Sequence, residues 1–246
     1  MAARPSRALA RILSKLGAAS RNTAALWIQA GRVAVNGAVI TDPEFNVLED
    51  ARITLDGHAL TAAAKLYYAL NKPRGLITTT RDEQDRATVY TCLPPKLRGQ
   101  LAPVGRLDKA SEGLLLFSND TAWSAALLEP RHHLPKRYHV QIDRLPDATL
   151  LQRLQHGVTC DGERLEVAAV SELRRGEKNA WLEITLTAGK NRHIRRMLAA
   201  CDTGVVRLIR VAIGPLQLGP LPKGQCRPLE TSELQQLALA LPPRKI

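Results

Sequence analysis

The stretch from Gly105 to Leu116 reads GRLDKASEGLLL and joins a charged loop to an apolar strand. A carboxylate, Asp108, lies in that loop between Arg106 and Lys109. Neighbouring cations favour the ionised form of a carboxyl group, and glycines allow loop conformations that other residues resist. An ionised Asp at the mouth of a sheet can act as a nucleophile or as a base. Taken alone, the same pattern also fits a surface ion pair.

The sequence around this loop predicts an α+β region from about residue 66 onward. Strand-like and helical segments follow one another there without a regular strand–helix alternation, which favours a mixed or antiparallel sheet with helices on it. The predicted strands are residues 67–70, 75–79, 114–118, 137–142 and 180–186. The predicted helices are residues 123–128, 147–155 and 193–200, with a last helix that Thr231 caps at its N-terminus.

The first 60 residues predict a separate small unit. Apolar residues recur at helical spacing from Leu9 to Leu16, and Ser20 is a suitable N-cap for a second helix over residues 21–30. An alternating segment then meets Asn36-Gly37, a strong signal for a β-hairpin. The unit has no acidic residue before Asp42, so its arginines are uncompensated. Two short helices and a hairpin with such a basic face predict an RNA-binding module.

Charge also favours a polyanionic partner. The chain of 246 residues has 35 Lys and Arg against 23 Asp and Glu, a net charge of +12. Each phosphate that such a protein neutralises releases counterions, which favours binding to nucleic acid. Apolar residues make up 45% of the sequence, enough for a folded core.

Other features exclude several classes of protein. The four cysteines, which are far apart and lack metal-ligand spacing, predict neither structural zinc nor a disulfide framework. We expect no metal and no cofactor. No apolar run approaches the roughly 20 residues of a membrane span, and the N-terminus does not read as a signal peptide, so we expect a cytoplasmic protein without a membrane segment.

Four segments together resemble the bacterial pseudouridine synthases that modify small- and large-subunit ribosomal RNA. The first is the Asp108 loop, and the second is YALNKPRG at residues 68–75. The third is KRYHV at residues 136–140, and the fourth is LTAGKNRHIRRM at residues 186–197. The N-terminal unit, over roughly residues 6–55, resembles the alpha-L RNA-binding domain first seen in a small-subunit ribosomal protein. The matches span nearly the whole chain.

The resemblance implies roles for individual residues. Asp108 is the expected catalytic aspartate, and Lys190 is expected to pair with it and hold it ionised. Tyr138 is expected to stack on the target base, and Leu186 to pack against that base from another side. His193 departs from the glutamine expected at its position, which leaves the role of that side chain open. The residues expected to contact RNA are Arg7, Arg11, Arg21, Arg32, Arg106, Arg192 and Arg195.

The same resemblance predicts the domain organisation and the reaction. We expect an alpha-L RNA-binding domain over residues 1–60, a linker over residues 61–65, and a catalytic domain over residues 66–246 with a mixed, mostly antiparallel sheet flanked by helices. The expected reaction is the isomerisation of uridine to pseudouridine in ribosomal RNA, with the large subunit favoured, on free RNA or on a ribosome assembly intermediate. We expect a monomer.

Three alternatives stay open at this point. The chain could be a non-catalytic ribosome assembly factor that only binds ribosomal RNA. It could instead be a pseudouridine synthase that acts on small-subunit ribosomal RNA or on transfer RNA. The sequence also leaves open whether Asp108 attacks the anomeric carbon or removes the ribose 2′ proton.

Overall fold

A computed structural model describes residues 6–48, 51–61, 63–79, 84 and 86–242 of the chain. The chain forms two compact units. The first combines the N-terminal 67 residues with residues 95–102 and 118–123, and the second contains residues 68–94, 103–117 and 124–246. Within the described ranges, none of the helices has the length and apolar character that crossing a membrane requires.

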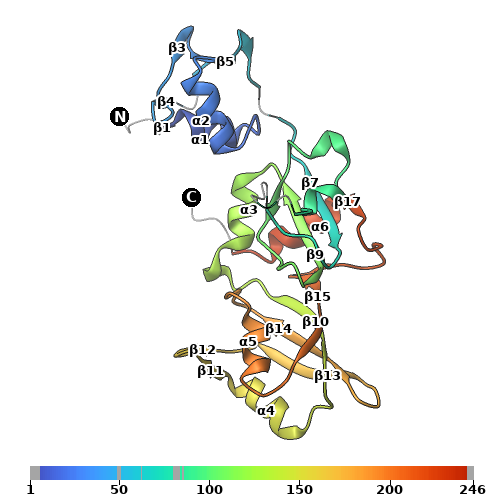
Figure 1. Cartoon of the computed structure of the whole chain (residues 1–246). Coiled ribbons are helices and arrows are strands. Elements are labelled where there is room, and N and C mark those ends of the chain that lie inside the picture. The colour runs from blue at the N-terminus through green and yellow to red at the C-terminus, as the bar shows by residue number, and fades with distance from the viewer. Residues whose placement is uncertain (1–5, 49–50, 62, 80–83, 85, 243–246) are drawn as a thin grey trace. The chain divides into compact units, whose positions relative to one another are not determined.

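In the first unit, two helices lie against a small sheet (Figure 1). Helix α1 spans Leu9–Lys15 and α2 spans Arg21–Gln29. The Ser20 hydroxyl accepts a hydrogen bond from the Thr23 amide, which confirms the predicted N-cap. The remaining elements are β1 (Ser6–Ala8), β2 (Val33–Val35), β3 (Ala38–Ile40), β4 (Asn46–Leu48), β5 (Ile53–Leu55) and β6 (His58–Ala59).

The hairpin between β2 and β3 forms at the predicted turn. Asn36 and Gly37 both have positive φ, 51° and 89°, as a two-residue hairpin turn with the twist of its strands requires. The order β3-β2-β5-β6 describes the sheet. Leu9, Leu13 and Ile28 are fully buried between the helices and this sheet, so the apolar face predicted for the first helix forms the core of the unit.

Most of the second unit is built on one large mixed sheet. Over the described residues it has nine strands, ordered β13-β14-β10-β15-β9-β7-β17, with β16 paired to β15 and β8 paired to β9. The pairs β13–β14, β14–β10, β10–β15 and β17–β7 are antiparallel, while β15 and β9 are parallel. The strand bounds are β7 Tyr67–Lys72, β8 Ala102–Val104, β9 Glu112–Ser118, β10 Lys136–Ile142, β13 Ala169–Arg175, β14 Ala180–Leu186, β15 Val205–Ile213, β16 Leu216–Gln217 and β17 Cys226–Pro228.

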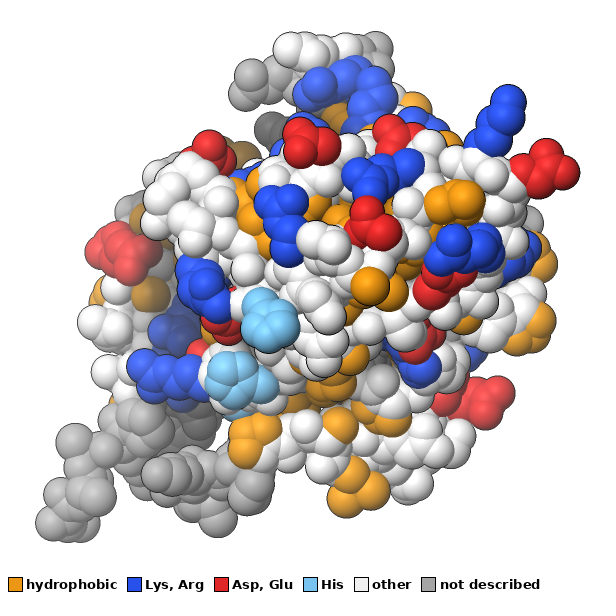
Figure 2. All heavy atoms as spheres, turned by 90° about the horizontal axis from the view of Figure 1, so that it is seen from below, with side chains coloured by type: hydrophobic (Ala, Val, Ile, Leu, Met, Phe, Trp, Pro, Cys, Tyr) orange, Lys and Arg blue, Asp and Glu red, His pale blue; other side chains and the backbone are white. Residues whose placement is uncertain are grey.

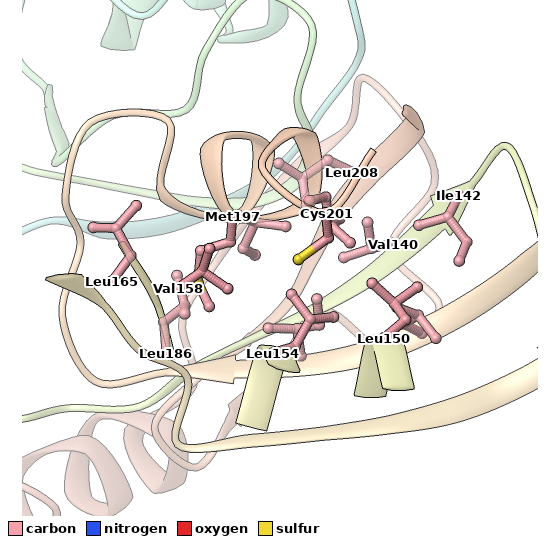
Figure 3. Close-up of a cluster of buried hydrophobic side chains, with 14 of the residues drawn as sticks. Val140, Ile142, Leu150, Leu154, Val158, Leu165, Leu186, Met197, Cys201 and Leu208 are labelled. Carbon is pink, nitrogen blue, oxygen red and sulfur yellow. The ribbon is translucent and has the colours of Figure 1, made fainter. Parts of the chain in front are cut away.

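Helices cover this sheet, as an α+β fold requires. Helices α4 and α5 pack on the part formed by β14, β10 and β15, and their apolar side chains interlock with those of the strands (Figure 3). Leu154 of α4, Met197 of α5 and Val140 of β10 are almost fully buried in this cluster. The bounds are α3 Thr121–Leu128, α4 Ala148–His156, α5 His193–Ala199 and α6 Thr231–Leu239, with a short hairpin of β11 (Val158–Cys160) and β12 (Glu163–Leu165) and 3₁₀ turns at Val89–Cys92, Pro95–Leu97 and Pro130–His132.

Two sequence predictions were wrong. Residues 75–79 do not form a strand. The chain turns at Gly75, and among the described residues the segment pairs only through an isolated bridge from Ile77 to Thr88. Helix α6 is capped by Glu230 rather than by Thr231. The Glu230 carboxylate and that of Glu233 form a reciprocal capping box, which satisfies two backbone donors at once.

Candidate active site

The loop that contains Asp108 is held by its backbone, which leaves the carboxylate exposed. It runs from the end of β8 to the start of β9 and begins at Gly105, whose φ is +76°. The Thr78 hydroxyl donates to the Leu107 carbonyl at 2.8 Å, and the Ser111 amide donates to the Asp108 carbonyl at 2.9 Å. Among the described residues, none forms a side-chain hydrogen bond or ion pair with the Asp108 carboxylate. It is therefore accessible to a ligand.

A buried lysine fixes this loop through hydrogen bonds to its backbone carbonyls. Lys72, at the end of β7, is 0% exposed, and its Nζ donates to the carbonyls of Pro73 at 3.1 Å, Asp108 at 3.1 Å and Ser111 at 2.7 Å. Burial lowers the pKa of Lys72 to about 8, against the opposing attraction of the Asp108 and Glu112 carboxylates. Lys72 lies in the second of the four motifs, but the resemblance implied no role for it. Its position before Pro73 was the available signal.

The start of β9 is anchored by a second buried charge. The Glu112 side chain is 3% exposed, accepts two hydrogen bonds from Arg207 at 3.0 Å each, and pairs with Lys223 at 2.5 Å. Burial favours a higher pKa for Glu112, but the hydrogen bonds from these two cations outweigh it and hold the pKa below its usual value. The loop is thus fixed at both ends while its central carboxylate stays exposed.

Arg195 of α5 is the predicted basic residue that the structure brings to this loop. Its Nη2 donates to the Ala110 carbonyl at 3.1 Å, and its Nε is buried without a hydrogen-bond partner among the described residues. Burial lowers the pKa of Arg195, as do the positive charges of Arg192 and Arg74, and attraction to Asp108 opposes them. Arg74 was missed by sequence reasoning, although its place in the second motif was visible. Arg192 and Arg74 therefore lie close enough to Arg195 to repel it, and Arg195 lies close enough to Asp108 to attract it.

Lys190 does not form the predicted pair with Asp108. Its Nζ lies 3.0 Å from Glu163 Oε1 and donates to the Arg164 carbonyl at 3.0 Å, in the β11–β12 hairpin. Lys190 precedes α5, whose N-cap is Arg192 in a left-handed conformation with φ 46°. Because of this turn, Lys190 contacts the β11–β12 hairpin, whereas Arg195 in the first turn of the helix contacts the Asp108 loop. The predicted ion pair between Lys190 and Asp108 is therefore replaced by one between Lys190 and Glu163.

Strand register places Tyr138 and Leu186 on one face of the sheet. Tyr138 on β10 pairs with Ile184 on β14, and Leu186 lies two residues further along the same strand. On its other side Tyr138 pairs with Arg210 of β15, which in turn pairs with Gly113 of β9. This row of strands leads from Tyr138 to the strand that follows the Asp108 loop. Leu186 is 3% exposed and belongs to the core cluster.

The other predicted residues of this unit differ in their exposure. Arg106 and Arg192 are exposed, and their side chains have no hydrogen bond or ion pair with the described residues. They are free to contact a ligand. His193 is 4% exposed, and burial lowers its pKa, so the imidazole is part of the interior at the start of α5.

In the first unit the predicted arginines are not equivalent. Arg11 and Arg21 are exposed and have no side-chain partner among the described residues. Arg7, on β1, is partly buried. Arg32 pairs with Asp56, with Nη2 to Oδ2 at 2.5 Å, and lies over the Trp27 ring at 5.5 Å. The charge of Arg32 is therefore compensated, which sequence reasoning did not foresee because Asp56 lies 24 residues away.

Not every surface of the molecule is basic. On the face in Figure 2, Asp and Glu side chains lie among the Lys and Arg side chains. Ion pairs of this kind include Arg144–Asp147, Arg164–Glu166 and Arg175–Glu172 in the second unit. Part of the net positive charge is thus offset by ion pairs, and Arg195 beside the Asp108 loop forms no such pair with a described carboxylate.

Fold and site together define an RNA-modifying enzyme with an accessory RNA-binding domain. Residues 66–200 match the RNA pseudouridylate synthase family, and residues 9–53 match the S4 domain. The chain belongs to the pseudouridine synthase family, and it carries an S4 RNA-binding domain at its N-terminus. It is a pseudouridine synthase that acts on RNA.

Individual relatives cover almost the whole chain. An uncharacterised RNA pseudouridine synthase of Aquifex aeolicus is 35% identical over 94% of this chain and 93% of its own length. The ribosomal large subunit pseudouridine synthase B of Bacillus subtilis is 30% identical over 93% of this chain and 94% of its own length. A crystal structure of a pseudouridylate synthase matches with a TM-score of 0.67 and 27% identity, over 94% of this chain and all of that one.

Proposed function

We propose that this enzyme isomerises a uridine of large-subunit ribosomal RNA and that Asp108 is its catalytic carboxylate. The observation that carries the proposal is an exposed carboxylate on a loop held by its backbone, within electrostatic reach of Arg195 and without an ion pair to any described residue. The large-subunit substrate follows from relatives such as the Bacillus subtilis protein, which is named for that activity.

The chemistry needs a uridine outside its stack. In the reaction the bond between uracil N1 and the ribose anomeric carbon breaks, and a bond from C5 to the same carbon forms. The hydrogen on C5 leaves as a proton, and N1 gains one, so the product has the same composition as the substrate. An enzyme that performs chemistry on a base takes that base out of the helix, at a cost of a few kcal/mol. Stacking on an aromatic ring recovers part of this cost.

Each residue of the proposed site has a distinct role in the reaction. Asp108 attacks the anomeric carbon or removes the ribose 2′ proton, and both routes need its ionised form. Arg195 attracts the Asp108 carboxylate, and Arg195 and Arg74 together attract the RNA backbone. Tyr138 stacks on the everted uracil and is a candidate for moving the C5 proton. Lys72 acts through the backbone, because it fixes the loop and does not face the ligand.

The first unit supplies affinity for folded RNA. Arg11 and Arg21, which are free to contact phosphates, carry this part of the proposal, while Arg32 contributes less because Asp56 neutralises it. Recognition of folded RNA rests on shape and on phosphate contacts, which exposed arginines provide. We place the enzyme in the cytoplasm, acting as a monomer on free ribosomal RNA or on an assembly intermediate.

Release of tritium from transcripts labelled at C5 of uridine tests the proposal. The wild-type enzyme releases tritium from large-subunit transcripts, whereas Asp108→Asn binds the same RNA with similar affinity and releases none. The conservative change keeps the shape of the side chain and removes its charge. Undiminished release by Asp108→Asn would show that another group is catalytic.

Transcripts of small-subunit ribosomal RNA and transfer RNA serve as alternative substrates. Preferential release from one of these would move the substrate assignment while it left the reaction intact. Tight binding to all transcripts without release would instead favour an assembly factor that lacks catalysis on these RNAs.

A further inference from the structure

A second cationic site lies beside Tyr138, and no described carboxylate forms an ion pair with it. Lys136 and Tyr138 are two residues apart on β10 and therefore project from the same face of the sheet. Arg210 pairs with Tyr138 from β15, and residues paired across antiparallel strands share a face. Lys136, Tyr138 and Arg210 thus form one cluster on the face that carries Leu186.

Arg210 is buried but incompletely satisfied. It is 6% exposed, and its Nε donates to the Leu114 carbonyl of β9 at 2.7 Å. Its Nη2 is buried and has no hydrogen-bond partner among the described residues. No described carboxylate forms an ion pair with this guanidinium. A buried charge without a partner is costly, so the site favours an anion near it.

Lys136 lies close enough to Arg210 to be repelled by its charge. It is partly buried, and its ammonium group makes neither a hydrogen bond nor an ion pair with the described residues. Burial lowers the pKa of Lys136, and the positive charge of Arg210 lowers it further, with no carboxylate opposing them. Two neighbouring cations without a described carboxylate partner attract the same anion.

We propose that Lys136, backed by Arg210, binds a backbone phosphate next to the target uridine. The proposal rests on the proposed function, because it takes the anion from the chemistry of that substrate. A nucleotide whose base stacks on Tyr138 carries phosphates on both sides of its ribose. The cluster offers one of them a direct contact from Lys136 and a fixed positive charge from Arg210. Charge-assisted contacts of this type are among the stronger ones in proteins.

Lys136→Met tests the direct contact, with Lys136→Arg as the conservative variant and Lys178→Met as the matched control. Lys178 is exposed in the turn between β13 and β14, so its loss changes the net charge equally. With labelled ribosomal RNA, Lys136→Met raises KM about tenfold or more while kcat stays within about twofold. Lys136→Arg recovers most of the affinity. Lys178→Met leaves KM unchanged.

Salt dependence separates a phosphate contact from a structural role. Loss of one phosphate contact lowers the slope of log affinity against log salt concentration by about 0.7 for single-stranded RNA. We expect this decrease for Lys136→Met and not for Lys178→Met. Equal slopes for wild type and Lys136→Met, or an equal effect of both Met variants, would overturn the proposal.

Inorganic phosphate provides a test that does not need catalysis. Compared with chloride at the same ionic strength, phosphate at about ten times its Kd raises the midpoint of thermal unfolding of the wild type by about 3 °C. It leaves Lys136→Met unchanged. An equal shift in both proteins, or a shift in neither, contradicts the site. Absence of tritium release by the wild type would count against the proposed function alone, because this measurement is independent of turnover.

Discussion

Gly113→Ala is the substitution for which the structure predicts the largest loss of stability near the site. Gly113 has a φ of +101°, and a Cβ built on it would lie 2.2 Å from the Arg210 carbonyl oxygen and 2.8 Å from the Arg210 nitrogen. Both atoms belong to the backbone of the neighbouring parallel strand and cannot turn away. Backbone strain of this kind costs about 1–3 kcal/mol, and overpacking adds about 1–3 kcal/mol. We expect Gly113→Ala to lower the free energy of unfolding by about 3–5 kcal/mol.

Gly75→Ala is the matched control for this prediction. Gly75 has almost the same φ, +99°, but a Cβ there would meet no atom within 4 Å. The control therefore has the cost of the backbone conformation without the clash, about 1–3 kcal/mol. Urea titrations of wild type and both variants measure the difference, with the m-value as a check on two-state behaviour. Equal destabilisation by the two substitutions would refute the close approach of β9 and β15.

Two further predictions concern the cations around Asp108. The pKa of Lys72 is about 8 in the folded protein, below its unfolded value of 10.5, so the unfolded state binds more protons between these two pH values. The free energy of unfolding therefore rises with pH across this window, by up to about 3 kcal/mol from this group. Lys72→Met removes the rise, which urea unfolding of both proteins from pH 7 to 10 measures. Arg195→Gln lowers kcat by about tenfold or more while Lys190→Gln leaves kcat nearly unchanged, and single-turnover kinetics with labelled RNA would contradict the assignment if the order were reversed.

Much of the site was visible in the sequence because its residues lie in short, ordered motifs. The Asp108 loop was recognisable from its glycines, its flanking charges and the apolar strand after it. Tyr138 and Leu186 were placed in strands by alternation and by motif. Their common face follows from a register that no local pattern specifies, since Tyr138 and Ile184 are 46 residues apart along the chain.

The missed features share a physical cause. Strand β15, the parallel neighbour of β9 almost 100 residues away, was not among the predicted strands. Its central position in the sheet could not be predicted either, because pairing between distant strands leaves no local trace. The buried state of Arg210 follows from that pairing. In the same way, the segment 75–79 has the composition of a strand but only one bridging partner.

The sequence by itself determined the two-part organisation in outline, the α+β class, the hairpin at Asn36-Gly37 and the identity of the exposed carboxylate. These depend on periodicity, capping, turn chemistry and motifs, all of which act over a few residues. Only the tertiary structure decided which cations meet Asp108, because Lys190 and Arg195 are close in sequence yet lie on opposite sides of the turn that starts α5. Which charges pair depends on where each side chain points, and the packing of α5 on the sheet sets that orientation.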